Sequence, residues 1–160
     1  MTETQKLVQE GRLVRFVKSF PEHINEETAM AYFNVVRTEA ASPEYRLSSS
    51  EVDELDGMNL APYNLNENDT AIYLTKLISA WGHRHYASQE KSIEDFRHHM
   101  HGARFCFDKS GRAALRSSWN NVALECFKQS LSIHKWAHAQ EDIKMTKMRI
   151  KFLQNNLSHS

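Results

Sequence analysis

The stretch from residue 112 to residue 135 carries apolar side chains around more than half of a helical circumference. At 3.6 residues per turn, one apolar stripe runs through Trp119 and Cys126, and an adjacent stripe runs through Phe127 and Leu131. A single neighbouring helix cannot cover so wide an arc, so a helix of this kind needs partners on two sides. We therefore expect the chain to be organised around this helix.

Helical patterns recur along the rest of the chain, whereas sustained period-two alternation and hairpin turns are absent. Capping signals at Asn25, Ser48, Asn68 and Ser88 mark expected helix starts. The main helices are predicted over residues 3–20, 26–41, 69–86, from 89 to a turn bracketed by Gly102 and Gly111, 112–135 and 140–157, with a short helix over 49–55 in the irregular segment. With 160 residues, the sequence predicts an all-α fold, a single-domain bundle of five or six helices with an irregular acidic segment around residues 42–68.

Two features of the 112–135 helix give packing expectations. Trp119, Val122 and Phe127 are expected in the core, because they lie within the apolar arc. Arg112 and Arg116 also lie on the apolar side, where an unpaired guanidinium is costly. We expect at least one of the two to pair with a carboxylate from residues 22–69.

Charge is distributed unevenly along this chain of zero net charge. Residues 22–69 carry a net charge of −9, residues 70–160 carry +7, and eight of the nine histidines lie in the latter part. The two parts of the single domain 1–160 can neutralise each other within one fold, which is the preferred interpretation. Alternatively, the basic half, 70–160, engages an acidic partner.

The favoured functional prediction is a non-catalytic binding or regulatory protein that engages nucleic acid or an acidic protein surface through its basic half. Stripes of Lys and Arg on helices suit phosphate backbones without base-specific contacts. No cofactor is expected in this interpretation. The residues predicted to form the surface are Arg97, Arg104, Lys109, Arg112, Arg116, Lys144, Lys147 and Lys151.

A metal-binding protein or metal-dependent enzyme is the alternative. Glu94, His98 and His101 follow one another at spacings of four and three residues, which places a carboxylate and two imidazoles on one helix face. Such donors suit zinc, copper or iron. The pair His83 and His85 adds a ligand if its helix packs nearby. Neighbouring arginines disfavour a cation, and no HExxH or zinc-type cysteine pair occurs.

Other classes receive less support from the sequence. No nucleophile-elbow or phosphate-binding glycine motif is present, so no catalytic residue is assigned and an enzyme is disfavoured. Cys106 and Cys126 are expected to be buried free thiols. The absence of a membrane-length apolar run or a secretory pattern leads us to expect a cytoplasmic protein without a membrane partner. A structural helical subunit of a larger complex, or a homo-oligomer, stays open.

Overall fold

The computed structural model describes residues 17, 19–89, 92–133 and 140–158, and within them the fold is all-α. Six α-helices occur, together with a short 3-10 helix, and no strand is present in these ranges. The helices are α2 (Glu26–Ala41), α3 (Ser49–Gly57), α4 (Asp69–Ala87), α5 (Ile93–Arg116), α6 (Asn120–Ile133) and α7 (Gln140–Ser158), with η1 (Ala61–Tyr63) between α3 and α4. The predicted fold class is therefore confirmed, whereas the predicted helix at 3–20 falls almost entirely outside the described residues.

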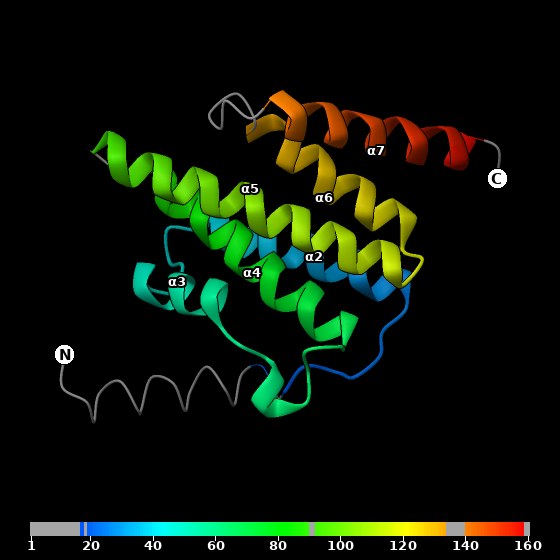
Figure 1. The fold of residues 1–160 in the computed structure, drawn as a ribbon. Helices are drawn as coiled ribbons and strands as arrows, with labels where there is room; N and C mark the ends of the chain where they lie inside the picture. The colour runs from blue at the N-terminus through cyan, green and yellow to red at the C-terminus, as the bar shows by residue number, and fades with distance from the viewer. Residues whose placement is uncertain (1–16, 18, 90–91, 134–139, 159–160) are drawn as a thin grey trace.

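The antiparallel pair α4 and α5 forms the centre of the bundle (Figure 1). Helix α2 packs against α4 and α6. The principal helix contacts of α3 are with α4. Helix α6 returns along α5, and α7 lies on the outer side of α6. No described helix combines the length and apolar character needed to cross a bilayer.

Three of the predicted capping residues begin helices as expected. The Asn25 side chain accepts a hydrogen bond of 2.8 Å from the Thr28 amide, and Asn68 caps α4 in the same way. At α3, the Ser48 hydroxyl accepts from the Glu51 amide at 3.2 Å, while the Glu51 carboxylate accepts from the Ser48 amide at 3.2 Å. These contacts satisfy amides that the first turn of a helix leaves without intrahelical partners.

The predicted helix boundaries are wrong around α5 and α6. Helix α5 continues through both Gly102 and Gly111 to Arg116, and the single predicted helix 112–135 is divided by a turn. Ser118 occupies the left-handed region with φ of 63°, which reverses the chain before α6 begins. Further upstream, Ser88 is the C-cap of α4. The N-cap of α5 is Ser92, whereas the sequence predicted Ser88.

The glycines of α5 serve packing and not chain reversal. A Cβ added at Gly111 would lie 2.8 Å from the ring of Phe127, closer than side-chain atoms can approach. Gly111 therefore lets α6 approach α5, at a helix-propensity cost of about 1 kcal/mol relative to Ala. A glycine that ends a helix and one that admits a neighbouring ring have the same sequence signature, which explains the error.

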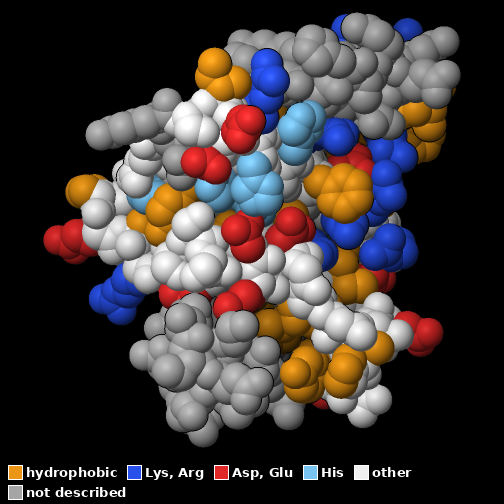
Figure 2. Space-filling view, turned by 60° about the vertical axis from the view of Figure 1, so that its left-hand side comes forward, with side chains coloured by type: hydrophobic (Ala, Val, Ile, Leu, Met, Phe, Trp, Pro, Cys, Tyr) orange, Lys and Arg blue, Asp and Glu red, His pale blue; other side chains and the backbone are white. Residues whose placement is uncertain are grey.

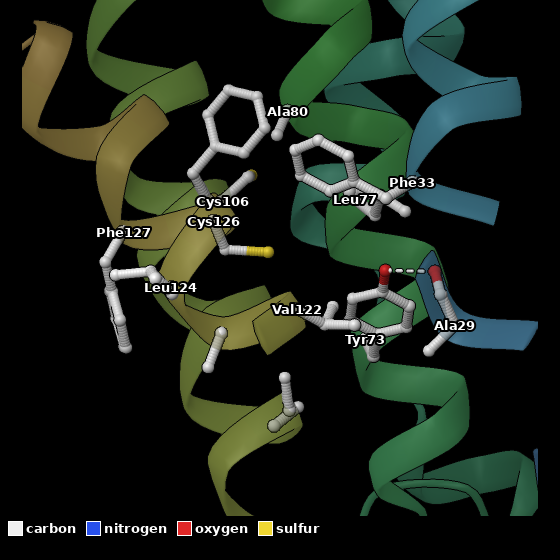
Figure 3. Close-up of a cluster of buried hydrophobic side chains, with 14 of the residues drawn as sticks. Ala29, Phe33, Tyr73, Leu77, Ala80, Cys106, Val122, Leu124, Cys126 and Phe127 are labelled. Carbon is white, nitrogen blue, oxygen red and sulfur yellow. Dashed lines mark hydrogen bonds between the residues drawn. The ribbon is translucent and has the colours of Figure 1, made fainter. Parts of the chain in front are cut away.

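The core confirms the expected burial of Trp119, Val122 and Phe127, which are 6%, 0% and 0% exposed. Figure 3 shows side chains from α2, α4, α5 and α6 meeting in this cluster. The buried Tyr73 hydroxyl donates a hydrogen bond of 2.7 Å to the Ala29 carbonyl and so joins α4 to α2. The same ring meets Trp119 edge-on at a centroid distance of 5.5 Å.

Charged pairs link the acidic and basic parts of the chain, as expected. The Arg116 Nε lies 2.8 Å from Asp69 Oδ1, which confirms the predicted pairing with a carboxylate from residues 22–69. Arg112 instead pairs with Asp108 one turn earlier in α5, at 2.6 Å.

Candidate metal centre

Three histidines and two aspartates from three helices meet at one end of the α4–α5 pair. His83 lies near the end of α4, and His98 and His99 lie near the start of α5, so the antiparallel packing brings them together. Helix α3 packs on α4 and adds Asp53 and Asp56. Figure 2 shows histidine side chains gathered on one face, with acidic side chains on either side of them.

The spacing of these groups is close to that of a metal site. Asp53, His83, His98 and His99 each offer one ligand atom, and the four atoms lie within 4.8 Å of one another. His98 Nε2 is 3.0 Å and His83 Nε2 is 4.0 Å from Asp53 Oδ1, and the Nδ1 atoms of His83 and His99 are 3.0 Å apart. In a tetrahedral zinc site, nitrogen ligands at about 2.0–2.1 Å from the ion are about 3.4 Å from each other. Separations of up to 4.8 Å exceed this value, so the side chains would have to move inward to close the set around one ion.

Burial divides the four side chains into a fixed pair and an accessible pair. His83 and His99 are 0% and 3% exposed, so surrounding side chains restrict their rings. The side chains of His98 and Asp53 are 59% and 46% exposed. An ion can thus reach the site from solvent and be held on its inner side by rings that are already positioned.

The Nε2 atom of His83 is the least satisfied atom of the site. It is buried and has no hydrogen-bond partner among the described residues. Asp56 Oδ2 lies 3.6 Å away, beyond hydrogen-bond distance, so this contact is chiefly electrostatic. A buried polar atom without a partner costs about 1–3 kcal/mol, and such an atom in a native fold calls for an explanation.

The other nitrogen of His83 sets the state of the ring. Its Nδ1 faces the Nδ1 of His99 at 3.0 Å, and only one proton fits between the two atoms. The Nε2 of His99 lies 3.4 Å from the Ser49 hydroxyl. When His83 donates through Nδ1, its Nε2 keeps a free lone pair, which is the form that ligates metals. The Nδ1 of His99 then accepts this proton, so His99 ligates an ion only after this hydrogen bond is broken.

A second group of potential ligands shares His83. The thiol of Cys106 donates to Asp56 Oδ1 at 3.0 Å, and one ligand atom from each of Asp56, His83 and Cys106 lies within 4.8 Å of the others. When its Nε2 carries the proton, the His83 ring lowers the pKa of Asp56 to about 2, helped by Cys106 and Lys76 and against the opposing effect of burial. Burial and the adjacent Asp56 raise the pKa of the Cys106 thiol. Cys106 is therefore a protonated thiol in the metal-free protein.

Only one of the three sequence-predicted metal ligands belongs to either group. His98 does, whereas Glu94 and His101 lie exposed on α5 and belong to neither group. His83 joins the site as suggested, but His85 instead contacts the Ala40 carbonyl through Nδ1 at 2.6 Å.

His99 and the two aspartates of α3 were not predicted as metal ligands from the sequence. His98 and His99 are adjacent residues, about 100° apart around the helix axis, so a single-face pattern captures only one of them. The contribution of Asp53 depends on how α3 packs on α4, which helical spacing alone does not reveal. The one available signal was the shared composition of the two helix ends, with histidines at the end of α4 and the start of α5.

The predicted basic surface is partly occupied by internal ion pairs. Arg116 and Arg112 pair with Asp69 and Asp108 as described above, and Arg149 lies 3.0 Å from Asp108. Lys109 lies 4.4 Å from the centroid of the Phe105 ring. Of the other predicted residues, Arg97, Lys147 and Lys151 are exposed, Arg104 is partly buried, and the side chain of Lys144 lies outside the described residues. Binding of an acidic partner stays a prediction.

Comparisons with protein-family models, curated protein sequences and solved structures give no match for this chain. Its function is therefore inferred from the geometry of the site.

Proposed function

We propose that this chain is a metal-binding protein that holds one zinc ion through Asp53, His83, His98 and His99. The observation that carries the proposal is the buried, unpartnered Nε2 of His83, which lies within reach of two carboxylates. A cation at this position would satisfy the nitrogen and the carboxylates together. Three imidazoles and one carboxylate are donors that zinc accepts in a tetrahedral arrangement.

The ligand set favours a structural or regulatory role for the ion. Four protein ligands fill a tetrahedral shell, whereas catalytic zinc keeps a position open for water or substrate. One ion would connect Asp53 of α3 with His83 of α4 and with the start of α5. Because the assembled set belongs to the folded chain, ion binding is expected to stabilise the fold and to fasten α3 to the central helix pair.

Calorimetric titration of the metal-free protein with Zn²⁺ tests the proposal. The expected result is one ion per chain, with His98→Ala weakening the affinity by at least about a hundredfold, since loss of an outer-shell partner alone costs 10- to 100-fold. His101→Ala is the matched control, because His101 lies exposed on the same helix and outside both ligand groups. Its affinity is expected to equal that of the wild type.

Two results would overturn the proposal. One is wild-type protein that takes up no zinc. The other is equal weakening by His98→Ala and His101→Ala, which would indicate scattered binding to surface histidines. Circular dichroism of the metal-free variants checks that the helices persist. Both substitutions replace an exposed side chain with Ala, the best helix former, so folding is expected to be retained.

The second candidate function is the engagement of nucleic acid or an acidic protein through the basic half. The observation in its favour is Phe105, which is 50% exposed beside Lys109 and could stack against a base next to a phosphate contact. The ion pairs of Arg112, Arg116 and Arg149 count against it, because they neutralise cations that the surface would need.

A further inference from the structure

His83 lies at the junction of two ligand groups that differ in chemical character. Toward solvent it meets Asp53 and His98, which offer oxygen and nitrogen. Toward the interior it meets Asp56 and Cys106, which offer oxygen and sulfur. The first group suits borderline ions such as Zn²⁺, and a thiolate suits softer ions.

The inner group is built into the core. Cys106 and His83 are both 0% exposed, and the Asp56 side chain is 31% exposed. Cys106 Sγ and Asp56 Oδ1 are 3.0 Å apart, and Asp56 Oδ2 and His83 Nε2 are 3.6 Å apart, so the carboxylate bridges the thiol and the ring. Two of the three donors are consequently held in place before any ion arrives.

A buried lysine lies on the remaining side of Asp56. Lys76 Nζ donates to the Asp56 carbonyl at 2.6 Å and lies 4.0 Å from Oδ1. The ammonium leaves Oδ2 facing His83, and it offsets part of the negative charge that an ionised thiol would add beside Asp56. Lys76 therefore reduces the electrostatic cost of holding a carboxylate and a thiolate together in a buried position.

We propose that Asp56, His83 and Cys106 form a second coordination set, selective for a thiophilic ion and mutually exclusive with the zinc set. Binding forms a metal–sulfur bond as the Sγ–H proton leaves to water or buffer, and no group is oxidised or reduced. Exclusion follows because the single Nε2 of His83 faces both aspartates and can ligate one ion at a time. A thiophilic ion would leave His98 and Asp53 without an ion. It would connect α3 to α5 through Asp56 and Cys106, whereas zinc would connect them through Asp53 and His98.

This inference rests on the proposed function, because both coordination sets use His83. The following experiment distinguishes a failure of the inference from a failure of the proposed function. Metal-free protein is titrated with Cd²⁺ while the thiolate-to-cadmium charge-transfer absorption is recorded, and with Zn²⁺ by calorimetry. The wild type is expected to show the absorption band at one equivalent of Cd²⁺. Cys106→Ser should abolish it, whereas Cys126→Ser should retain it, because Cys126 is equally buried but lies outside the group.

Substitutions of individual ligands distinguish two separate coordination sets from one common site. His98→Ala should lose zinc affinity and keep the cadmium band, and His83→Ala should lose both. Wild-type protein that binds zinc but gives no thiolate band with Cd²⁺ would overturn the inference and leave the proposed function standing. A band without zinc binding would overturn the proposed function alone. Loss of both ions in a folded His98→Ala variant would mean one common site and would also overturn the inference.

Discussion

Gly102 of α5 packs directly against the imidazole of His83 in α4. A Cβ built on Gly102 would lie 2.7 Å from His83 Nε2 and 2.8 Å from two of the ring carbons. No side chain other than hydrogen fits there while the ring keeps its place. The glycine thus allows both the close approach of the two helices and the observed position of the buried His83 ring.

Substitution of Gly102 should therefore affect the fold and the site together. Gly102→Ala is expected to destabilise the protein by about 1–3 kcal/mol through overpacking, partly offset by about 1 kcal/mol of helix propensity. Displacement of the ring should also weaken zinc binding. Urea unfolding and calorimetry measure the two effects. Gly57→Ala is the control, since nothing lies within 4 Å of its added Cβ. A Gly102→Ala protein as stable as the wild type and with equal zinc affinity would show that the ring is placed elsewhere.

Gly111 gives an independent test of the continuous α5 helix. Its added Cβ would lie 2.8 Å from the Phe127 ring, so Gly111→Ala is expected to cost about 1–3 kcal/mol despite its better helix propensity. Chemical denaturation measures this change. The double variant Gly111→Ala with Phe127→Leu should recover part of the loss, since the smaller side chain leaves room for the methyl group. Absence of any recovery would argue against this contact.

Trp119 follows the turn between α5 and α6 and packs on Tyr73. Trp119→Ala is expected to cost about 3–5 kcal/mol, as large-to-small substitutions of core aromatic residues do. That loss approaches the whole stability of many domains of this size. Thermal denaturation followed by circular dichroism would detect it. A variant that melts at the wild-type temperature would place Trp119 outside the core.

The ion pair of Arg116 with Asp69 joins the basic and acidic parts of the chain but is largely exposed, with side chains 51% and 28% accessible. A double-mutant cycle with Arg116→Ala and Asp69→Ala is expected to give a coupling free energy of only about 0.2–1 kcal/mol. The coupling should fall as salt is added, because solvent ions screen exposed charges. A coupling free energy well above this range, or one insensitive to salt, would indicate a less hydrated pair than the structure shows.

The basic-surface prediction has a separate test in Lys147 and Lys151, which are both exposed on α7. If nucleic acid binds there, replacing them together with Lys144 by Ala should lower affinity for all sequences alike. The salt slope should also fall by about 0.7–0.9 for each phosphate that the variant no longer neutralises. Fluorescence anisotropy with duplex and single-stranded DNA across salt concentrations provides the measurement. Wild-type protein without binding at low salt would exclude this surface as a nucleic-acid site.

Helix identity was largely predictable from the sequence, because periodicity and caps are local properties. Asn25, Ser48 and Asn68 begin helices where side-chain chemistry indicated. The roles of Gly102 and Gly111 were not predictable, since each depends on a ring from another helix. The candidate metal centre was only partly predictable from the sequence for the same reason. His98 stood out by spacing along its own helix, while Asp53 and His99 depend on tertiary packing.

The position of a bound ion tests the proposed zinc centre most directly. Crystals grown with one equivalent of Zn²⁺ and measured at the zinc absorption edge would give an anomalous difference map. We expect one dominant peak within ligand distance, about 2.0–2.2 Å, of His83 Nε2, His98, His99 and Asp53. No peak at this position, or a dominant peak on an exposed histidine such as His101, would contradict the zinc centre.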